Sequence, residues 1–450
     1  MRCKIFRSRP EILDKAGLQL RQRESAATFA LDCKRSILCS VTDIREPLFP
    51  LTTLDLPGLL RAKRERLQAE MNRRGVEALW LFGPGHLRYL LGAAVLPSDA
   101  GRTHHQRTAA LLRADAPCPH VFTPNPEQLP AEIPDDFIHP PLYLESESGV
   151  VQALRELEEH MGASLQGALA VDEYSPGLFF ELERRWKTQV EDASTLVAAV
   201  KLCKLPDEIE CIRRAQSINE AAMTTVQASL RAGLRQSDLS ALFFEQVFSL
   251  GANANGIDPI WQVMEPRIAD GPWTTHGHVA FPTCTSDRIL RRGDVLWVDA
   301  GIDYCGYQSD FGRTFVVDAK PSPQQLDQGK RWLDVVRAVL ELVKPGVTGA
   351  TLTRRAVEVA GGTKPWLEHF YLIHGVGTEP AEQPLLGTDL GEAFDESLVL
   401  APGMTLVLEP AIWQDGHAGY RSEEIVAVTE DGYQMLSDFN YAPYEESMTG

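Results

Sequence analysis

Apolar positions in the first half of the chain alternate between helical and strand-like spacing. From Leu56 to Arg74 they recur every three or four residues, Gly75 ends the pattern, and the apolar run 76–82 that follows is typical of a buried strand. Further strand-like runs and helical patterns follow at 109–111, 120–122, 150–161 and 176–186. Strands and helices that alternate in this way predict a small α/β layer domain over residues 50–200.

A second domain is predicted over residues 201–450, where the helical patterns become longer. Pro206 and the acidic residues after it form a strong helix start, because proline fits the first turn and acids favour the positive end of the helix dipole. The apolar stripe of this helix consists of Ile209, Ile212, Ala215, Ile218 and Ala222. Other helices are predicted at 236–250, 323–343 and 349–360.

Residues 1–45 show neither pattern. The segment is basic and irregular and has no apolar core of the kind that a secretory signal carries. A transit peptide would be poor in acids, and this segment contains Glu11, Asp14, Glu24 and Asp32. We expect a poorly ordered extension that lies outside the fold.

Composition and charge narrow the class of protein. The 450 residues are 44% hydrophobic and 24% charged, which is ordinary for a globular protein, and the formal net charge is −18. A chain this acidic is not expected to bind nucleic acid or an anionic membrane, and no apolar run approaches the roughly 18 residues of a membrane-spanning helix. The eight cysteines form no C-x-x-C pair. We therefore expect neither a zinc ribbon nor a disulfide framework, and scattered free thiols fit a cytoplasmic location.

The candidate chemistry begins with two acids in the segment 294–315. The apolar run 295–299 ends in Asp299, and Asp310 precedes a second strand-like run at 314–317. Two strands joined by a glycine-containing connection would form a hairpin that brings Asp299 and Asp310 together. Two adjacent buried carboxylates need a shared proton or a metal ion, whereas two solvated loop acids need neither. This segment alone leaves both interpretations open.

Three residues near the C-terminus favour a metal ion. His374 lies among glycines in the segment 373–377, Glu409 ends an apolar run, and Glu423 precedes a β-branched run. Four carboxylates and one imidazole form an oxygen-rich set, which suits divalent ions such as Mn, Fe, Co or Zn. Arg421, two residues before Glu423, is predicted to share a strand face with it and to orient an acid there through a bidentate ion pair.

These residues resemble the ligands of the pita-bread metallopeptidase family, which includes methionine aminopeptidase, Xaa-Pro aminopeptidase, prolidase and creatinase. The family's ligands Asp, Asp, His, Glu and Glu match, in order, the contexts VDAG, SDFGRTF, HGVG, GMTLVLEP and the strand before VTEDG. The resemblance covers residues 50–440 and implies an α/β (α+β) fold, with a pita-bread catalytic domain after a smaller creatinase-like N-terminal domain. It also implies two divalent ions, with Mn expected first and Fe, Co or Zn as alternatives. Their implied ligands are Asp299, Asp310, His374, Glu409 and Glu423.

The resemblance further implies the reaction. The expected enzyme is a dinuclear hydrolase of the Xaa-Pro aminopeptidase or dipeptidase type, in which a metal-bridged hydroxide attacks a peptide carbonyl. Glu409 would be both a ligand and the proton shuttle, and His278, or else His276, would handle the leaving or attacking group. Asp303 and Glu424, which neighbour the ligands in sequence, are expected to point away from them. The expected substrate is a small peptide or small molecule, and the expected assembly is a homodimer.

One position departs from the family pattern. Most family peptidases carry a second histidine in an H-E-x-P run, where it contacts the scissile carbonyl, but here the run is Ala381-Glu-Gln-Pro384. Alanine donates no hydrogen bond, so either Tyr371, His369 or His278 replaces the missing donor, or the chemistry is not ordinary peptide hydrolysis. The alternative function is a metal-dependent lyase or small-amide hydrolase on the same fold, as in dimethylsulfoniopropionate lyase and creatinase. A binding protein with an inactive site would be expected to have lost ligands, and all five are present.

Overall fold

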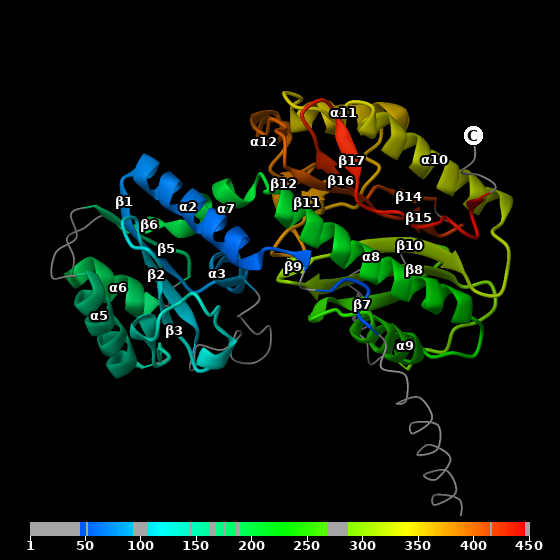
Figure 1. Ribbon diagram of the computed structural model, residues 1–450. Coiled ribbons are helices and arrows are strands. Elements are labelled where there is room, and N and C mark those ends of the chain that lie inside the picture. The colour runs from blue at the N-terminus through cyan, green and yellow to red at the C-terminus, as the bar shows by residue number, and fades with distance from the viewer. Residues whose placement is uncertain are drawn as a thin grey trace, which may run out of the picture. The chain divides into compact units, whose positions relative to one another are not determined.

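The computed structural model (Figure 1) describes residues 46–445 except 51–52, 93–106, 145, 162–166, 174–175, 186–189, 268–286 and 415. The expected extension 1–45 and the candidate residues His276 and His278 lie outside the described residues. None of the helices in the described part of the chain is both long enough and apolar enough to cross a membrane.

A six-stranded sheet forms the centre of the N-terminal part, in the order β4-β3-β2-β1-β5-β6. Its strands are β1 Val76–Leu81, β2 Ala109–Arg113, β3 His120–Phe122, β4 Ile138–His139, β5 Ala168–Val171 and β6 Val190–Asp192. The sheet is mixed, because β1 pairs antiparallel with β2 and parallel with β5. The three strands predicted from apolar runs in this part are confirmed.

Helices cover both faces of this sheet (Figure 1). They are α2 Leu56–Arg74, α3 Pro84–Leu91, α5 Glu147–Met161, α6 Pro176–Arg185 and α7 Ala193–Lys201, with 3₁₀ turns η3 Pro126–Gln128 and η4 Asp135–Phe137. Successive strand residues point to opposite faces. Leu79 and Leu81 of β1 therefore pack with α2, α3 and α7, while Ala78 and Trp80 pack with α5 and α6. The three layers form the α/β architecture that the alternating pattern predicts.

The C-terminal part is built on two further sheets and a short ribbon. One sheet has the order β10-β8-β7, with β9 paired to β8, and the other has the order β12-β11-β13-β16-β17, while β14 pairs with β15. The strands are β7 Ala254–Met264, β8 Val295–Tyr304, β9 Tyr307–Gln308, β10 Phe311–Val316, β11 Ile373–Gly375, β12 Glu382–Leu386, β13 Thr405–Leu408, β14 Ala411–Trp413, β15 Gly419–Arg421, β16 Glu424–Val428 and β17 Tyr433–Met435.

Two helix pairs pack on these sheets. The helices are α8 Pro206–Ser229, α9 Gln236–Ser249, α10 Pro323–Leu340, α11 Gly349–Val359 and the short α12 Glu392–Ser397. Side chains of α8 and α9 share a core with β7 and β8, and side chains of α10 and α11 share a second core with β11, β13 and β16. All four longer helices were predicted from their patterns and are confirmed. In Figure 1 the helix α8 runs along the sheet that contains β8 and β10.

Two local predictions are wrong. The strand predicted to end at Asp299 continues to Tyr304, so Asp299 lies inside β8. Arg421 and Glu423 do not share a strand, because β15 ends at Arg421 and Glu423 precedes β16. The backbone N–H of Glu423 instead donates to the carbonyl of Gly312 (3.0 Å), which ties this turn to β10.

Candidate metal centre

An antiparallel pair of strands holds the two aspartates. β8 pairs with β10 so that Asp299 lies opposite Gly312, and Asp310 immediately precedes β10. Val298 and Ala300, the neighbours of Asp299, are fully buried in the core with α8. Because strand residues alternate sides, Asp299 faces away from that core. The predicted hairpin-like pairing of these acidic segments is therefore present, although Asp299 is not at a strand end.

His374 is the only imidazole among the five candidate ligands, and its orientation is fixed by a backbone contact. It lies in β11, and its Nδ1 donates to the carbonyl of Gly375 (2.9 Å). The other ring nitrogen, Nε2, lies 3.2 Å from Asp310 Oδ2 and 3.6 Å from Glu409 Oε1. A histidine held through Nδ1 in this way presents the Nε2 lone pair to a metal ion.

Arg421 connects the two glutamates. Its guanidinium makes a very short ion pair with Glu409 Oε2 and lies 3.4 Å from Glu423 Oε1. The same guanidinium lies 4.2 Å from the ring centroid of Trp297, which is close enough for a cation–π contact. Arg421 therefore contacts both glutamates, from a strand that does not include Glu423, whereas the sequence analysis expected it to orient one acid through a bidentate ion pair.

Glu423 occupies space that only a glycine at position 312 leaves open. A Cβ added to Gly312 would lie 2.4 Å from Glu423 Cδ and 2.6 Å from its Oε1. Real Cβ atoms essentially never approach other heavy atoms this closely. The glycine of the SDFGRTF segment thus has a steric role in the site.

The five side chains converge on one buried cluster with an excess of negative charge. Ligand oxygens of Asp299, Asp310 and Glu423 lie within 4.8 Å of one another. Burial and the charge of Asp310 raise the pKa of Asp299 to about 7, and burial with both aspartates raises the pKa of Glu423 well above its usual value. Three buried oxygens, Asp299 Oδ1, Glu409 Oε1 and Glu423 Oε2, accept no hydrogen bond from any residue that the structure describes.

Two supporting residues on α8 were missed by the sequence analysis. Gln216 Oε1 accepts the backbone N–H of Asp310 (3.2 Å). Asn219 Nδ2 donates to the carbonyl of Ala300 (2.7 Å) and to Ser309 Oγ (3.0 Å). Both amides are almost completely buried and lie on the apolar stripe of the helix. Polar residues within an otherwise apolar stripe were the signal that could have revealed them.

The two neighbouring acids are held by other partners. Asp303 accepts from the backbone N–H of Gly306 (2.9 Å) and from Gln308 Nε2 (2.9 Å). Glu424 pairs with Arg313 Nη2 (3.0 Å). Each of these two acids thus has hydrogen-bond or ion-pair partners outside the cluster, which agrees with the expectation that neither belongs to it.

Tyr371 is the one described candidate for the missing hydrogen-bond donor that lies beside the cluster. Its ring centroid is 5.0 Å from that of His374, and its hydroxyl makes no hydrogen bond with any residue in the described part of the chain. Burial and the nearby carboxylates raise the pKa of the phenol, so it keeps its proton. His369 is 77% exposed and pairs with Asp389 (2.7 Å), and Ala381 is exposed.

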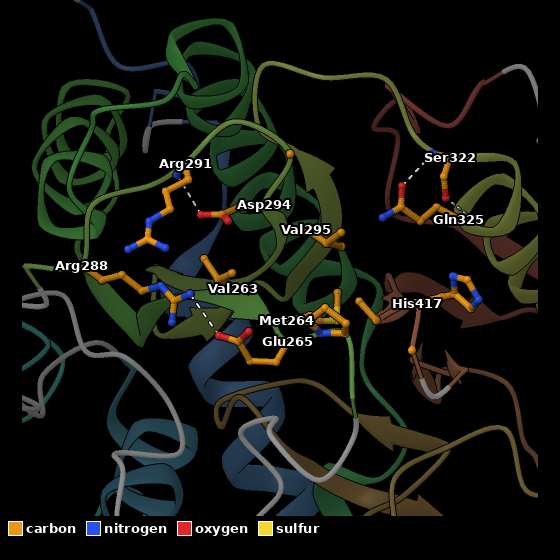
Figure 2. Close-up of a pocket in the computed structure, with 14 residues that line it drawn as sticks. Val263, Met264, Glu265, Arg288, Arg291, Asp294, Val295, Ser322, Gln325 and His417 are labelled. Carbon is orange, nitrogen blue, oxygen red and sulfur yellow. Dashed lines mark hydrogen bonds and ion pairs between the residues drawn. The ribbon is translucent and has the colours of Figure 1, made fainter.

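A separate polar pocket of about 340 Å³ lies at the start of β8 (Figure 2). Val295 lines it, and Asp299 lies four positions further along the strand, a distance of about 13 Å. Two charged groups of the pocket form an ion pair, since Arg288 Nη2 lies 3.2 Å from Glu265 Oε1, and the Asp294 carboxylate accepts a hydrogen bond from the backbone N–H of Arg291 (2.8 Å). The pocket shares no residue with the carboxylate cluster.

Two family models match this chain. Residues 63–203 match the creatinase/prolidase N-terminal domain, and residues 210–430 match metallopeptidase family M24. The chain carries a domain of metallopeptidase family M24 over residues 210–430. All five candidate ligands lie within this range.

Two relatives of this chain are dipeptidases by name. The probable dipeptidase PepE of Mycobacterium tuberculosis (strain ATCC 25618 / H37Rv) is 30% identical over 256 residues, which are 56% of this chain and 62% of that protein. The Xaa-Pro dipeptidase of Pyrococcus furiosus is 30% identical over 244 residues, 54% of this chain and 65% of that protein. Each alignment spans less than two thirds of the relative. The crystal structure of the prolidase from Pyrococcus horikoshii OT3 matches with a TM-score of 0.64 at 21% identity, covers 85% of this chain and 99% of that one, and shows the pita-bread fold.

Proposed function

We propose that this M24 protein is a metal-dependent peptidase of the Xaa-Pro dipeptidase type that holds two divalent ions in the carboxylate cluster. The observation that carries the proposal is the set of three buried carboxylate oxygens without a hydrogen-bond donor, next to an imidazole nitrogen. Unpaired buried charges are costly, and metal coordination is one of the ways in which proteins satisfy them. The proposed ligands are Asp299, Asp310, His374, Glu409 and Glu423.

The charge of the site fits two ions. Four carboxylates face one guanidinium, so the ionised cluster has three negative charges in excess. When bound there, two divalent ions would offset this charge, lower the pKa of a water molecule and polarise the scissile carbonyl. Oxygen-rich ligands with one imidazole suit Mn²⁺, and they also accept Fe²⁺, Co²⁺ or Zn²⁺.

The residues of the cluster have different roles in the proposed reaction. Arg421 holds Glu409 through Oε2, which leaves Glu409 Oε1 directed toward His374 Nε2 (3.6 Å). Glu409 is thereby placed to take a proton at Oε1 and to return it to the leaving amine. His374, Glu409 and Glu423 are each at most 3% exposed, so their side chains are shielded from bulk solvent.

Tyr371 supplies the hydrogen bond that Ala381 cannot. Its protonated phenol lies beside His374 and has no partner among the described residues, so it is free to donate to the oxygen of the substrate carbonyl. Donors of this kind stabilise the negative charge that develops on that oxygen. His278, the other proposed contact to the substrate, lies outside the described residues and stays a prediction, as do the homodimer and the cytoplasmic location.

The names of two relatives support a small peptide as the substrate, because one is a probable dipeptidase and the other an Xaa-Pro dipeptidase. The test is turnover of an Xaa-Pro dipeptide by chelator-treated protein to which Mn²⁺ has been returned. We expect hydrolysis that depends on the metal, and a decrease in kcat on the order of 100-fold in Tyr371→Phe with a small change in KM. Failure to hydrolyse any Xaa-Pro dipeptide in the presence of Mn²⁺ or Fe²⁺ would refute the proposal.

Ala381 favours one second candidate, a metal-dependent lyase or small-amide hydrolase. An exposed alanine at the position of a hydrogen-bond donor leaves room for a substrate of another shape. The same protein, assayed on a panel of small amides and on a sulfonium substrate for C–S cleavage, distinguishes the two functions. Turnover on that panel without dipeptide hydrolysis would establish the second candidate.

A further inference from the structure

Three histidines form a second cluster in the N-terminal part. It is separate from the carboxylate cluster around Asp299 and Glu423, which lies in the M24 domain and is called the M24 centre below. His120 begins β3, His139 ends β4, and His160 lies in the last turn of α5. One ring nitrogen from each lies within 4.8 Å of the other two. His120 Nδ1 and His139 Nε2 are 2.9 Å apart.

The fold itself brings these rings together. β3 and β4 pair in parallel with Phe122 opposite His139, so these two side chains share a face of the sheet. His120, two residues before Phe122, lies on that face as well. The helix α5 covers this face and places His160 over the pair, with ring centroids 4.1 Å from His120 and 4.4 Å from His139.

Two of the rings, those of His120 and His139, favour the uncharged form. Burial, reinforced by the other two imidazoles, lowers the pKa of His120 to about 4. Burial and His160 also lower the pKa of His139. Only a neutral imidazole can offer a lone pair to a metal ion. The lowered pKa values of His120 and His139 therefore favour metal binding by these rings over their protonation.

Packing explains why the three rings stack, but it leaves one ring nitrogen without a hydrogen bond among the described residues. The hydrogen bond between His120 and His139 uses one nitrogen of each ring. The Nε2 of His160 is buried and accepts or donates no hydrogen bond with any described residue. The nearest carboxylate, that of Glu156 one helical turn earlier, lies 4.0 Å from this nitrogen.

We propose that His120, His139 and His160 bind a transition-metal ion that prefers imidazole, namely Zn²⁺ or the chemically related Ni²⁺ and Cu²⁺. Metal–nitrogen distances of about 2.0–2.1 Å in a tetrahedral site place ligand nitrogens about 3.4 Å apart. The three ring nitrogens already lie within 4.8 Å of one another, and the rings are half-buried, so small side-chain rotations would bring the nitrogens to this spacing. Glu156 or a water completes the coordination.

The donor sets of the two sites differ in a way that separates them experimentally. The M24 centre offers carboxylates and one imidazole, whereas the histidine cluster offers three imidazoles. Imidazole suits Zn²⁺, Ni²⁺ and Cu²⁺, while oxygen ligands suit Mn²⁺. The proposal therefore does not depend on the reaction of the M24 centre.

Zinc stoichiometry tests the site. Full-length wild type, His160→Ala, His139→Gln and the control His369→Asn are dialysed against Zn²⁺ at pH 7.5, and zinc per chain is measured by mass spectrometry. His369 is exposed and tolerates asparagine at its positive φ, so this control removes an imidazole elsewhere. We expect the wild type and the control to bind one more zinc ion than His160→Ala and His139→Gln. Equal zinc content in all four proteins would overturn the proposal.

Copper spectroscopy tests the same site in the wild type, where no variant has to fold. Cu²⁺ bound at the histidine cluster should show electron paramagnetic resonance splitting from three nitrogens. The M24 centre has His374 as its one imidazole ligand and cannot produce that pattern. A spectrum with coupling to no more than one nitrogen would contradict the proposal.

Discussion

Replacement of Gly312 by alanine should displace Glu423 without disturbing the fold. The added Cβ would lie 2.4, 2.6 and 2.7 Å from Cδ, Oε1 and Cγ of Glu423, whereas ordinary contacts begin at 3.4 Å. The carboxylate must therefore retreat by about 1 Å, a misplacement that typically costs about 100-fold in rate. Gly312 does not adopt a positive φ, so alanine adds no backbone strain. A displaced ligand should also weaken metal binding, by roughly 10- to 100-fold.

The assay is an Mn²⁺ titration of chelator-treated protein, followed by dipeptide hydrolysis at saturating Mn²⁺. Gly432→Ala is the matched control, because a Cβ at Gly432 meets no atom within 4 Å and this glycine also lacks a positive φ. We expect Gly312→Ala to lose both affinity and kcat, and Gly432→Ala to keep both. If Gly312→Ala bound Mn²⁺ and turned over substrate like the wild type, the placement of Glu423 in the centre would be refuted.

Three other substitutions test the roles of Arg421, Lys63 and Ala381. Arg421→Ala should lower metal retention roughly 10- to 100-fold because Glu409 loses its ion-pair partner, whereas unchanged metal content would argue against a positioning role. Burial lowers the pKa of Lys63 from 10.5 to about 8, so the unfolded chain binds more protons between these pH values. The unfolding free energy should therefore rise with pH across that window, by about 3 kcal/mol at most, and Lys63→Met should lack this rise; equal pH slopes in the two proteins would contradict the assignment. Ala381→His should raise dipeptide turnover if the protein is a peptidase that lost one donor, and it should lower native activity without any peptidase gain if the pocket serves another substrate.

Periodicity predicted much of the architecture, because helix and strand patterns depend on neighbouring residues. The helix that begins at Pro206 and the strand that follows Gly75 are examples. The five candidate ligands were identified because their motifs occur in the same order as in the resembling family. Motif order by itself does not show that the side chains are in contact. Their convergence within a few ångströms required the structure, since Asp299 and Glu423 are far apart in the sequence.

Contacts between distant segments could not be predicted from the chain. Nothing near Arg421 in sequence indicates that a strand end separates it from Glu423 or that Trp297 lies against its guanidinium. The histidine cluster was missed for the same reason, because His120 and His160 belong to a strand and a helix that meet only through packing. The supporting amides of α8 differ from these cases, since their position on an apolar stripe was visible in the sequence.

We propose that one cluster of five side chains holds two divalent ions and that peptide hydrolysis depends on them. This proposal is tested most directly by counting the Mn²⁺ ions bound per chain while measuring Xaa-Pro dipeptide turnover, as Mn²⁺ is returned to chelator-treated protein. We expect no turnover without metal, a maximum near two bound ions, and loss of both binding and turnover in Asp310→Asn. Full turnover in the metal-free protein, or Asp310→Asn with wild-type Mn²⁺ content and activity, would contradict it.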